Sequence, residues 1–468
     1  MKQIKNIATL DELRALLADV GVELPIAQEI DPDAGLGRPI EIGGGHAPAL
    51  AAPNRLAILP MEGWDAGSDG MPTDLVRRRW SRFGGSGAGL VWGEASAVRP
   101  DGRANPRQLM ITNDTAGALA ELRASLATDQ VAGIQLTHSG RWSNPTGTPA
   151  PRTAYRHPVL DTRNDVGDEH VLSDTELDDL GEVYVAAAHI ASEAGFDFVD
   201  VKACHGYLLH ELLTAYDRPG RYGGDLAGRS RLLTSVIGEI RQQLPSLTVA
   251  VRLSAFDLLP HEPGTDGIGV PSTKGPYRYA FGGDEGGLAP DLDETHQLLD
   301  RLAAIGISLV STTAGSPYYN PHAQRPAFFP PSDGYKPPED PLVGVARQIH
   351  ATAEITRRHP DLTIIGSGYT YLQDWIGHVG QAAIEQGWTD MVGLGRMALS
   401  YPDLPQTLLK RDELDRRQIC RTFSDCTTAP RAGLVSGCYP LDPYYNAREE
   451  RIELARAKKE ARRRLQRG

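Results

Sequence analysis

The chain has 468 residues, 40% of them hydrophobic and 23% charged, a composition typical of globular proteins and a length that fits one large α/β barrel with extensions or several smaller domains. Its formal net charge of −12 argues against broad nucleic-acid binding, which needs a basic surface. We find no secretory signal and no apolar run long enough to span a membrane, so we expect a cytoplasmic protein. Four cysteines in so long a chain indicate no disulfide framework.

Eight short apolar runs alternate with helical patterns along the chain. Most are nearly continuous in Val, Ile and Leu, as expected of strands that are buried on both faces. Eight such repeats predict a closed parallel (β/α)₈ TIM barrel, and an open doubly wound sheet is the alternative. The predicted strands are 55–60, 88–94, 131–138, 196–202, 247–253, 307–313, 362–367 and 389–394.

Helix signals and loop lengths support this arrangement. Ser173 and Glu176 predict a capping box at the start of one helix, and Gly195 is expected to end it in a left-handed conformation. Four long segments follow the third to sixth strands, at 139–172, 203–224, 254–290 and 314–341. In a barrel these loops gather at the C-terminal face, where active sites lie.

Two extensions flank the predicted barrel, which takes residues 51–405. Residues 1–50 form an N-terminal extension with a helix near 10–19 and a Gly/Pro-rich leader. Residues 406–468 hold three of the four cysteines and, from Arg448, a basic helical tail. The tail lacks an apolar face, so we interpret it as a solvated or oligomer-contacting helix rather than a membrane-binding one. A homo-oligomer is therefore compatible with the sequence.

Glycines and one arginine mark a phosphate site. The seventh strand ends in Gly366, Ser367 and Gly368, and the eighth leads into Gly395 and Arg396. Loops after these two strands are the usual phosphate site of the barrel, because glycines let backbone N–H groups converge on an anion. Arg396 adds a forked cation suited to phosphate.

Further polar residues end strands whose interiors are apolar. They are Gln135, His138, Lys202, His205 and Arg252. Any one of them is explained as a core or rim residue, whereas five at one barrel mouth favour a binding site. Polar groups and a cation beside a phosphate site suggest a large planar cofactor with one phosphate, and FMN fits that description.

Six motifs over residues 50–405 resemble, in order and spacing, those of the Old Yellow Enzyme family of NADH:flavin oxidoreductases. They are LPM at 59–61, GEASAV at 93–98, IQLTHSGR at 134–141, HGYLLHE at 205–211 followed by RYGG at 221–224, VRLS at 251–254 and GLGR at 393–396.

The resemblance implies an FMN cofactor, with NAD(P)H binding over the flavin as the hydride donor. Gln135 would hydrogen-bond the pyrimidine edge, and Arg252 would stabilise negative charge near N1 and O2. The other implied cofactor contacts are Pro60, Met61 and Ala95 beside the ring, and Gly366, Ser367, Gly368, Gly395 and Arg396 at the phosphate.

The resemblance also implies catalytic roles. Tyr207 matches the tyrosine that protonates the substrate carbon in many members of the family. Lys202 and His205 would hold the oxygen of a small-molecule acceptor. The expected activity is an ene-reductase type, in which hydride passes from NAD(P)H through the flavin to an electron-poor acceptor such as an α,β-unsaturated carbonyl.

Two residues depart from the family pattern. Lys202 stands where the family usually has histidine, which keeps a donor and adds a fixed charge. Glu62 stands where threonine or cysteine commonly lies near flavin O4. A carboxylate there disfavours the reduced flavin anion, so we expect Glu62 to be structural and to point away, or the potential to be unusual.

The cysteines after the barrel depart as well. Larger relatives of this kind carry four closely spaced cysteines that hold an iron–sulfur cluster, whereas Cys420, Cys426 and Cys438 provide three. We therefore predict that this chain binds no metal and that the cysteines only pack.

Alternative functions stay open. One is a flavin-dependent oxidative dehydrogenase or demethylase with a separate electron acceptor, and another is a barrel that binds flavin without turnover. An aldolase-type barrel would not explain Gln135, Arg252 and Arg396 together. The sequence names neither the physiological acceptor nor the choice between NADH and NADPH.

Overall fold

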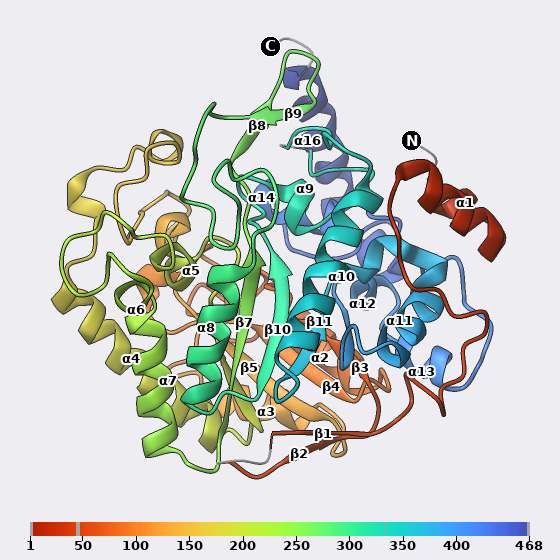
Figure 1. Cartoon of the computed structure of the whole chain (residues 1–468), viewed down its shortest axis with the longest axis horizontal. Coiled ribbons are helices and arrows are strands. Elements are labelled where there is room, and N and C mark those ends of the chain that lie inside the picture. Colours follow the sequence, from red (N-terminus) through yellow and green to blue (C-terminus); the bar gives the residue numbers. More distant parts are fainter. Residues whose placement is uncertain (1–2, 44–46, 333, 466–468) are drawn as a thin grey trace.

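Eight parallel strands close into a barrel in the computed structural model, which describes residues 3–43, 47–332 and 334–465 (Figure 1). The prediction of a closed (β/α)₈ barrel is confirmed, and every predicted run contains or overlaps a barrel strand. In spatial order the strands are β3 (Leu56–Ile58), β4 (Leu90–Ala97), β5 (Val131–Thr137), β6 (Phe198–Val201), β7 (Thr248–Phe256), β10 (Leu309–Ala314), β11 (Thr363–Gly366) and β12 (Met391–Leu394).

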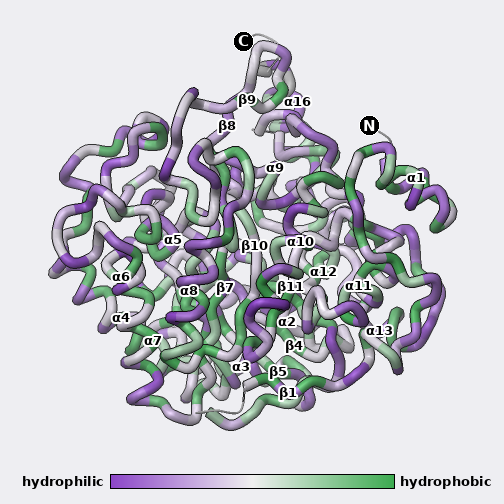
Figure 2. The backbone as a smooth tube through the Cα atoms, viewed as in Figure 1, coloured by the Kyte–Doolittle hydropathy of each residue, from purple (hydrophilic) through white to green (hydrophobic). Residues whose placement is uncertain are grey.

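Helices follow the strands and pack around the outside of the barrel. The main ones are α2 (Asp74–Gly84), α3 (Ala116–Ala124), α4 (Asp174–Glu193), α7 (Arg231–Gln243), α8 (Asp293–Ala304), α10 (Pro341–Arg358) and α11 (Ile376–Glu385). Shorter helices are α5 (Leu208–Leu212), α6 (Leu226–Arg229), α9 (Pro321–Gln324) and α12 (Met397–Ser400). In Figure 2 hydrophobic segments follow the barrel and hydrophilic ones dominate the outer loops.

The capping box of α4 is confirmed. The Ser173 hydroxyl accepts from the Glu176 backbone N–H at 3.2 Å, and the Glu176 carboxylate accepts from the Ser173 N–H at 2.8 Å. Gly195, with a φ of +84°, follows the helix in the left-handed conformation that glycine favours. This local agreement fixes where the chain turns into β6.

A small antiparallel ladder closes the N-terminal end of the barrel. It joins β1 (Ile40–Ile42) to β2 (Leu50–Ala52) within the segment predicted as an irregular leader, after the predicted helix α1 (Leu10–Val20). Ile42 and Ala52 are buried in one apolar cluster with Leu90, Val131 and Phe198 of the barrel interior. The N-terminal end is therefore filled with apolar side chains, while the C-terminal end carries the long loops and the antiparallel pair β8 (His261–Pro263) and β9 (Gly269–Pro271).

The C-terminal segment packs on the rim of the barrel. It contains α13 (Leu404–Leu409), α14 (Asp425–Arg431), α15 (Pro443–Asn446) and the predicted basic helix α16 (Glu450–Leu465). The carboxylate of Asp442, whose side chain is 2% exposed, accepts from Arg78 at 2.9 and 3.0 Å and from Arg82 at 2.7 Å. Both arginines belong to α2, so this ion cluster fastens the segment to the barrel. Among the described residues no helix combines the length and apolarity needed to cross a membrane.

Asp442→Asn tests this attachment. We expect the free energy of unfolding to fall by about 1–3 kcal/mol, between the values for exposed and buried pairs, because two partly exposed arginines lose their carboxylate. Limited proteolysis should cut residues 410–450 faster than in the wild type. Asp415→Asn is the matched control, since its partner Arg417 is 91% exposed. Equal proteolysis of both variants would contradict the proposed attachment.

Candidate active site

A cavity of about 270 Å³ opens at the C-terminal end of the barrel. It is lined by most of the residues predicted for the site, namely Pro60, Met61, Gln135, Lys202, His205, Tyr207, Arg252, Ser367, Gly368, Gly395 and Arg396. Three predicted residues are not on its wall: Ala95 lies within β4 beside Gln135, Gly366 is the last residue of β11, and His138 is buried after β5, 3.7 Å from Asp101. Strand ends and loops that are far apart in the sequence thus meet at one place.

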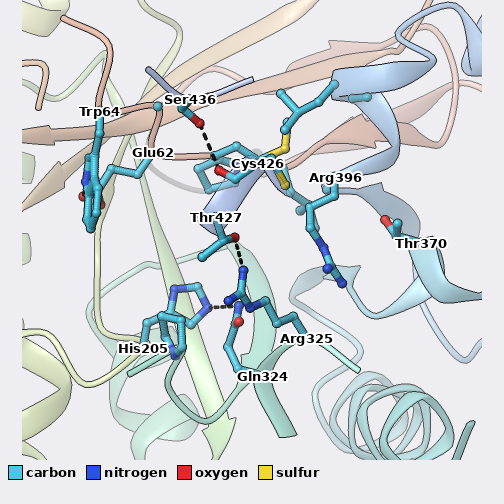
Figure 3. A pocket seen from close by; sticks show the side chains of 18 of the residues that line it. Glu62, Trp64, His205, Gln324, Arg325, Thr370, Arg396, Cys426, Thr427 and Ser436 are labelled. Carbon is cyan, nitrogen blue, oxygen red and sulfur yellow. Dashed lines mark hydrogen bonds between the residues drawn. The ribbon is translucent and has the colours of Figure 1, made fainter. Parts of the chain in front are cut away.

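One end of the cavity is suited to an anion. Gly368 has a φ of +96°, and a Cβ at Gly395 would meet no heavy atom within 4 Å in the described part of the chain. The Arg396 side chain points into the cavity (Figure 3), and its Nη1 is buried without a hydrogen-bond partner among the described residues. A buried, unsatisfied guanidinium N–H is costly unless a ligand accepts from it. This end of the cavity can therefore accept an anion, and its use as a phosphate site stays a prediction.

Gln135 and Arg252, which line the cavity, are positioned by a buried carboxyl group. Asp200 of β6 accepts from the Arg252 backbone N–H at 2.7 Å, from Trp92 Nε1 at 2.8 Å and from the Gln135 amide nitrogen. Because that nitrogen is bound to Asp200, the carbonyl oxygen of Gln135 is left for a ligand. Burial raises the pKa of Asp200 to about 6.

Arg252 lines the same cavity. Its Nη1 donates to the Pro60 carbonyl oxygen at 3.0 Å, and its Nε has no partner in the region that the structure covers. Burial lowers the pKa of Arg252 from its ordinary value. The guanidinium is thus held by the turn after β3 and keeps a donor for an electron-rich ring edge.

Glu62 faces the cavity, so of the two expected alternatives the one in which it points away is wrong, and the unusual flavin potential stays a prediction. Its two carboxylate oxygens each lie 3.1 Å from the Tyr207 hydroxyl, and it also accepts from Trp64 Nε1. Lys202 Nζ lies 3.5 Å from Glu62 and 3.7 Å from the centre of the Tyr207 ring. The ammonium group offsets the charge of the buried carboxylate, which explains why a glutamate is tolerated here.

Tyr207 is held as a neutral phenol. Burial, followed by the nearby Glu62 carboxylate and Tyr318, raises the pKa of Tyr207 well above its ordinary range. Its hydroxyl also lies 3.1 Å from that of Tyr318. The Tyr207 hydroxyl is thus held by hydrogen bonds to Glu62 and Tyr318, which lie on two other loops.

His205 is held as a neutral imidazole. The backbone of His205 is left-handed, with a φ of +65°, and its backbone N–H donates to the Ser254 hydroxyl at 3.0 Å. Nε2 lies 3.1 Å from the Thr313 hydroxyl and 3.3 Å from Gln324 Nε2 (Figure 3). Burial, followed by the charges of Arg252 and Lys202, lowers the pKa of His205 well below its ordinary value. The side chain can therefore donate one hydrogen bond without carrying a charge.

The C-terminal segment forms one wall of the cavity, a role that the sequence did not predict. Cys426, Thr427, Ser436, Cys438 and Tyr445 line it. Burial, followed by the nearby Cys420 and Cys426, raises the pKa of Cys438. Among the described residues no group of three or more His, Cys, Asp or Glu side chains is placed to hold a metal ion. The absence of a cluster stays a prediction.

A family model described as the NADH:flavin oxidoreductase / NADH oxidase family matches residues 37–270. An NADH:flavin oxidoreductase of Gibberella zeae is 30% identical over 240 residues, which cover 47% of this chain and 56% of that relative. An NADPH dehydrogenase of Listeria monocytogenes is 32% identical over 209 residues, which cover 44% and 60%. The match therefore spans less than two thirds of the length of these relatives.

Solved structures share the fold at low sequence identity. The complex of 2-naphthoyl-CoA reductase with 2-naphthoyl-CoA superposes with a TM-score of 0.69 and 17% identity, covering 89% of this chain and 58% of that one. An Old Yellow Enzyme homologue of Zymomonas mobilis gives 0.57 and 22%, covering 81% of this chain and 94% of that one.

The pKa of Asp200 predicts a pH effect on stability. Because the folded pKa of about 6 lies above the ordinary 3.8, Asp200 stabilises the fold fully below pH 3.8 and loses this contribution as the pH rises through 6. The difference is on the order of 3 kcal/mol. In Asp200→Asn this part of the pH dependence should vanish, as measured by chemical denaturation between pH 4 and 7. Exposed Asp129→Asn should keep the wild-type profile. Parallel profiles for Asp200→Asn and the wild type would refute the assignment.

Proposed function

Because the chain belongs to the NADH:flavin oxidoreductase / NADH oxidase family, we propose that it binds FMN and transfers hydride from NAD(P)H to this flavin. The hydride then passes from the reduced flavin to an electron-poor small molecule such as an α,β-unsaturated carbonyl. The observation that carries this proposal is a pair of guanidinium groups, Arg252 and Arg396, each of which has one buried nitrogen, Nε and Nη1 respectively. Each has an unpartnered N–H among the described residues, and both line the same cavity. They suit the ring edge and the phosphate of one flavin.

The residues present fit FMN. Arg396, Gly395 and the Ser367–Gly368 turn would hold its phosphate, and Arg252 with the Gln135 carbonyl oxygen would meet the polar edge of its ring. When bound, FMN supplies a two-electron carrier that accepts hydride from the nicotinamide and returns it to the acceptor. The chain supplies position and charge: a cation beside the ring edge favours the reduced anion.

Three side chains would bind the acceptor. Lys202 and neutral His205 can both donate to its carbonyl oxygen, which draws electron density from the conjugated carbon–carbon bond. Tyr207 lies beside them and can deliver a proton to the carbon next to the carbonyl group. Glu62, hydrogen-bonded to that hydroxyl, fixes where the proton lies.

The same contact favours a second candidate, the oxidative dehydrogenase. The Tyr207 hydroxyl donates to the Glu62 carboxylate, and its pKa is raised, so Tyr207 is a weaker acid than a free tyrosine. A carboxylate behind a tyrosine is also suited to removing a proton from a substrate that loses hydride. The direction of proton transfer therefore separates the two candidates.

Arg396→Ala tests the cofactor. Purified protein should release FMN on denaturation, identified by chromatography, and the variant should bind FMN about 10- to 100-fold more weakly, because a buried phosphate loses a charge-assisted hydrogen bond worth about 1.5–3 kcal/mol. Arg417→Ala, a change of the same charge at a 91% exposed site, is the control. Release of FAD, or no flavin, would refute the proposal.

Tyr207→Phe separates the half-reactions. Reduction of the flavin by NAD(P)H should stay nearly unchanged, since it needs no protein acid, whereas reoxidation by an enone should slow by ~10²–10⁴-fold. Reoxidation by a quinone, which needs no carbon protonation, is the internal control in stopped-flow traces.

Two outcomes would count against the reductive assignment. Unchanged enone turnover in Tyr207→Phe would show that the proton comes from elsewhere. Flavin reduction by an amine or alcohol substrate, but not by NAD(P)H, would favour the oxidative candidate.

A further inference from the structure

A second cavity of about 770 Å³ adjoins the first. The two share five lining residues, Trp64, Pro317, Tyr318, Pro430 and Arg431. A ligand whose reactive end lies in the inner cavity can therefore extend past Trp64 and Tyr318 into this outer cavity.

The outer cavity has an aromatic wall with unused polar atoms. Trp142 stacks on Tyr318, with ring centres 4.4 Å apart and planes 5° from parallel. Trp142 Nε1 and Asn144 Oδ1, both on residues that line the cavity, are buried without a hydrogen-bond partner in the part of the chain that the structure describes. One is a donor and the other an acceptor, so the wall can bind a polar, planar group.

The charged residues of this wall are mostly cationic. Those described are Arg107, Arg163 and Arg431 against the single acid Glu262, in a chain whose net charge is −12. Arg107 and Arg163 are both exposed, and Arg163 donates to the carbonyl oxygens of Tyr318 at 3.2 Å and His261 at 3.1 Å. Two guanidinium groups at the rim of a cavity attract a phosphate-bearing ligand.

Trp64 is held in a strained conformation between the two cavities. Its φ is +51°, a region that bulky side chains rarely adopt. The indole nitrogen is fixed on Glu62, and the ring contacts both cavities. Such strain persists only where the surroundings enforce it, and it places an aromatic face beside the path of a ligand.

We propose that the outer cavity binds the phosphorylated adenosine part of a ligand whose reactive end lies in the inner cavity. The adenine ring would stack on the aromatic wall, and the phosphates would meet Arg107 and Arg163. NADPH and the coenzyme A ester of an unsaturated acid share this chemistry, so either could be the source. The inference rests on the proposed function, because it assigns the far end of a substrate of that reaction.

The test uses two probes that contain the phosphorylated adenosine part but lack the reactive end of the ligand, 2′,5′-ADP and free coenzyme A. Their binding to flavin-loaded protein is measured by titration calorimetry. In the double variant Arg107→Ala/Arg163→Ala we expect affinity for the probe that binds to fall at least 10-fold while FMN content stays unchanged. Arg278→Ala, at an exposed site that lines neither cavity, is the control for lost charge.

The two sources give different kinetic results. If 2′,5′-ADP binds, the double variant should raise KM for NADPH more than for NADH with kcat little changed. If coenzyme A binds, the same variant should raise KM for a coenzyme A ester but not for the corresponding free enone. Either pattern supports the proposal.

The proposal is overturned if neither probe binds below millimolar concentration, or if the double variant binds as the wild type does. Both failures are distinct from failure of the proposed function. A protein that is reduced by NAD(P)H but binds neither probe refutes the outer site alone, and a protein that binds a probe but carries no flavin refutes the proposed function alone.

Discussion

The carboxyl group of Asp200 connects the strands that form the floor of the site. It lies on β6 and accepts from Trp92 on β4, Gln135 on β5 and the backbone of Arg252 on β7. A buried carboxyl with three donors is stable only while all three remain in place, because each loss would leave a group desolvated and unpaired. The Gln135 oxygen and the Arg252 guanidinium thus keep their positions without a ligand. In the proposed function these two groups would contact the flavin ring. This is the preorganisation that electrostatic catalysis needs.

Above that floor, nearby positive charges offset the negative charge of Glu62. Glu62 would oppose a reduced flavin anion, yet Lys202 lies 3.5 Å from it and Arg252 lines the same cavity. Lys202 and Arg252 also keep His205 neutral, since burial and their charges lower its pKa. Lys202 and Glu62, the two residues that depart from the pattern implied by the resemblance, are thus in contact and offset each other's charge.

Most of the barrel and of the inner site could be predicted from the sequence, because both depend on local patterns. Strands buried on both faces produce apolar runs, and polar residues at their ends mark the open face. The predicted bounds differ by up to three residues. Some apolar runs extend beyond the hydrogen-bonded ladder, as at 196–202 against β6 (Phe198–Val201), whereas β4 and β7 continue three residues past the predicted 88–94 and 247–253. The sequence also offers a signal for Asp200, because it is a charged residue inside the apolar run 196–202. The β1–β2 ladder, Trp64, Tyr318 and the wall from α14 could not be predicted, because they reach their places through tertiary contacts that leave no periodic signal.

One chain of ion pairs links the C-terminal segment to the turn that carries Glu62 and Trp64. Asp442 binds Arg78 and Arg82 of α2, and Arg79 of the same helix binds Asp65 and, at 2.7 Å, Glu94. Glu94 in turn accepts from the Gly63 backbone N–H at 3.2 Å. Residues 63 and 65 are thus fixed on either side of Trp64, which explains how its left-handed backbone is enforced. The segment that walls the inner cavity and the residue that separates the two cavities are therefore held by the same helix, so a shift of α2 would change both at once.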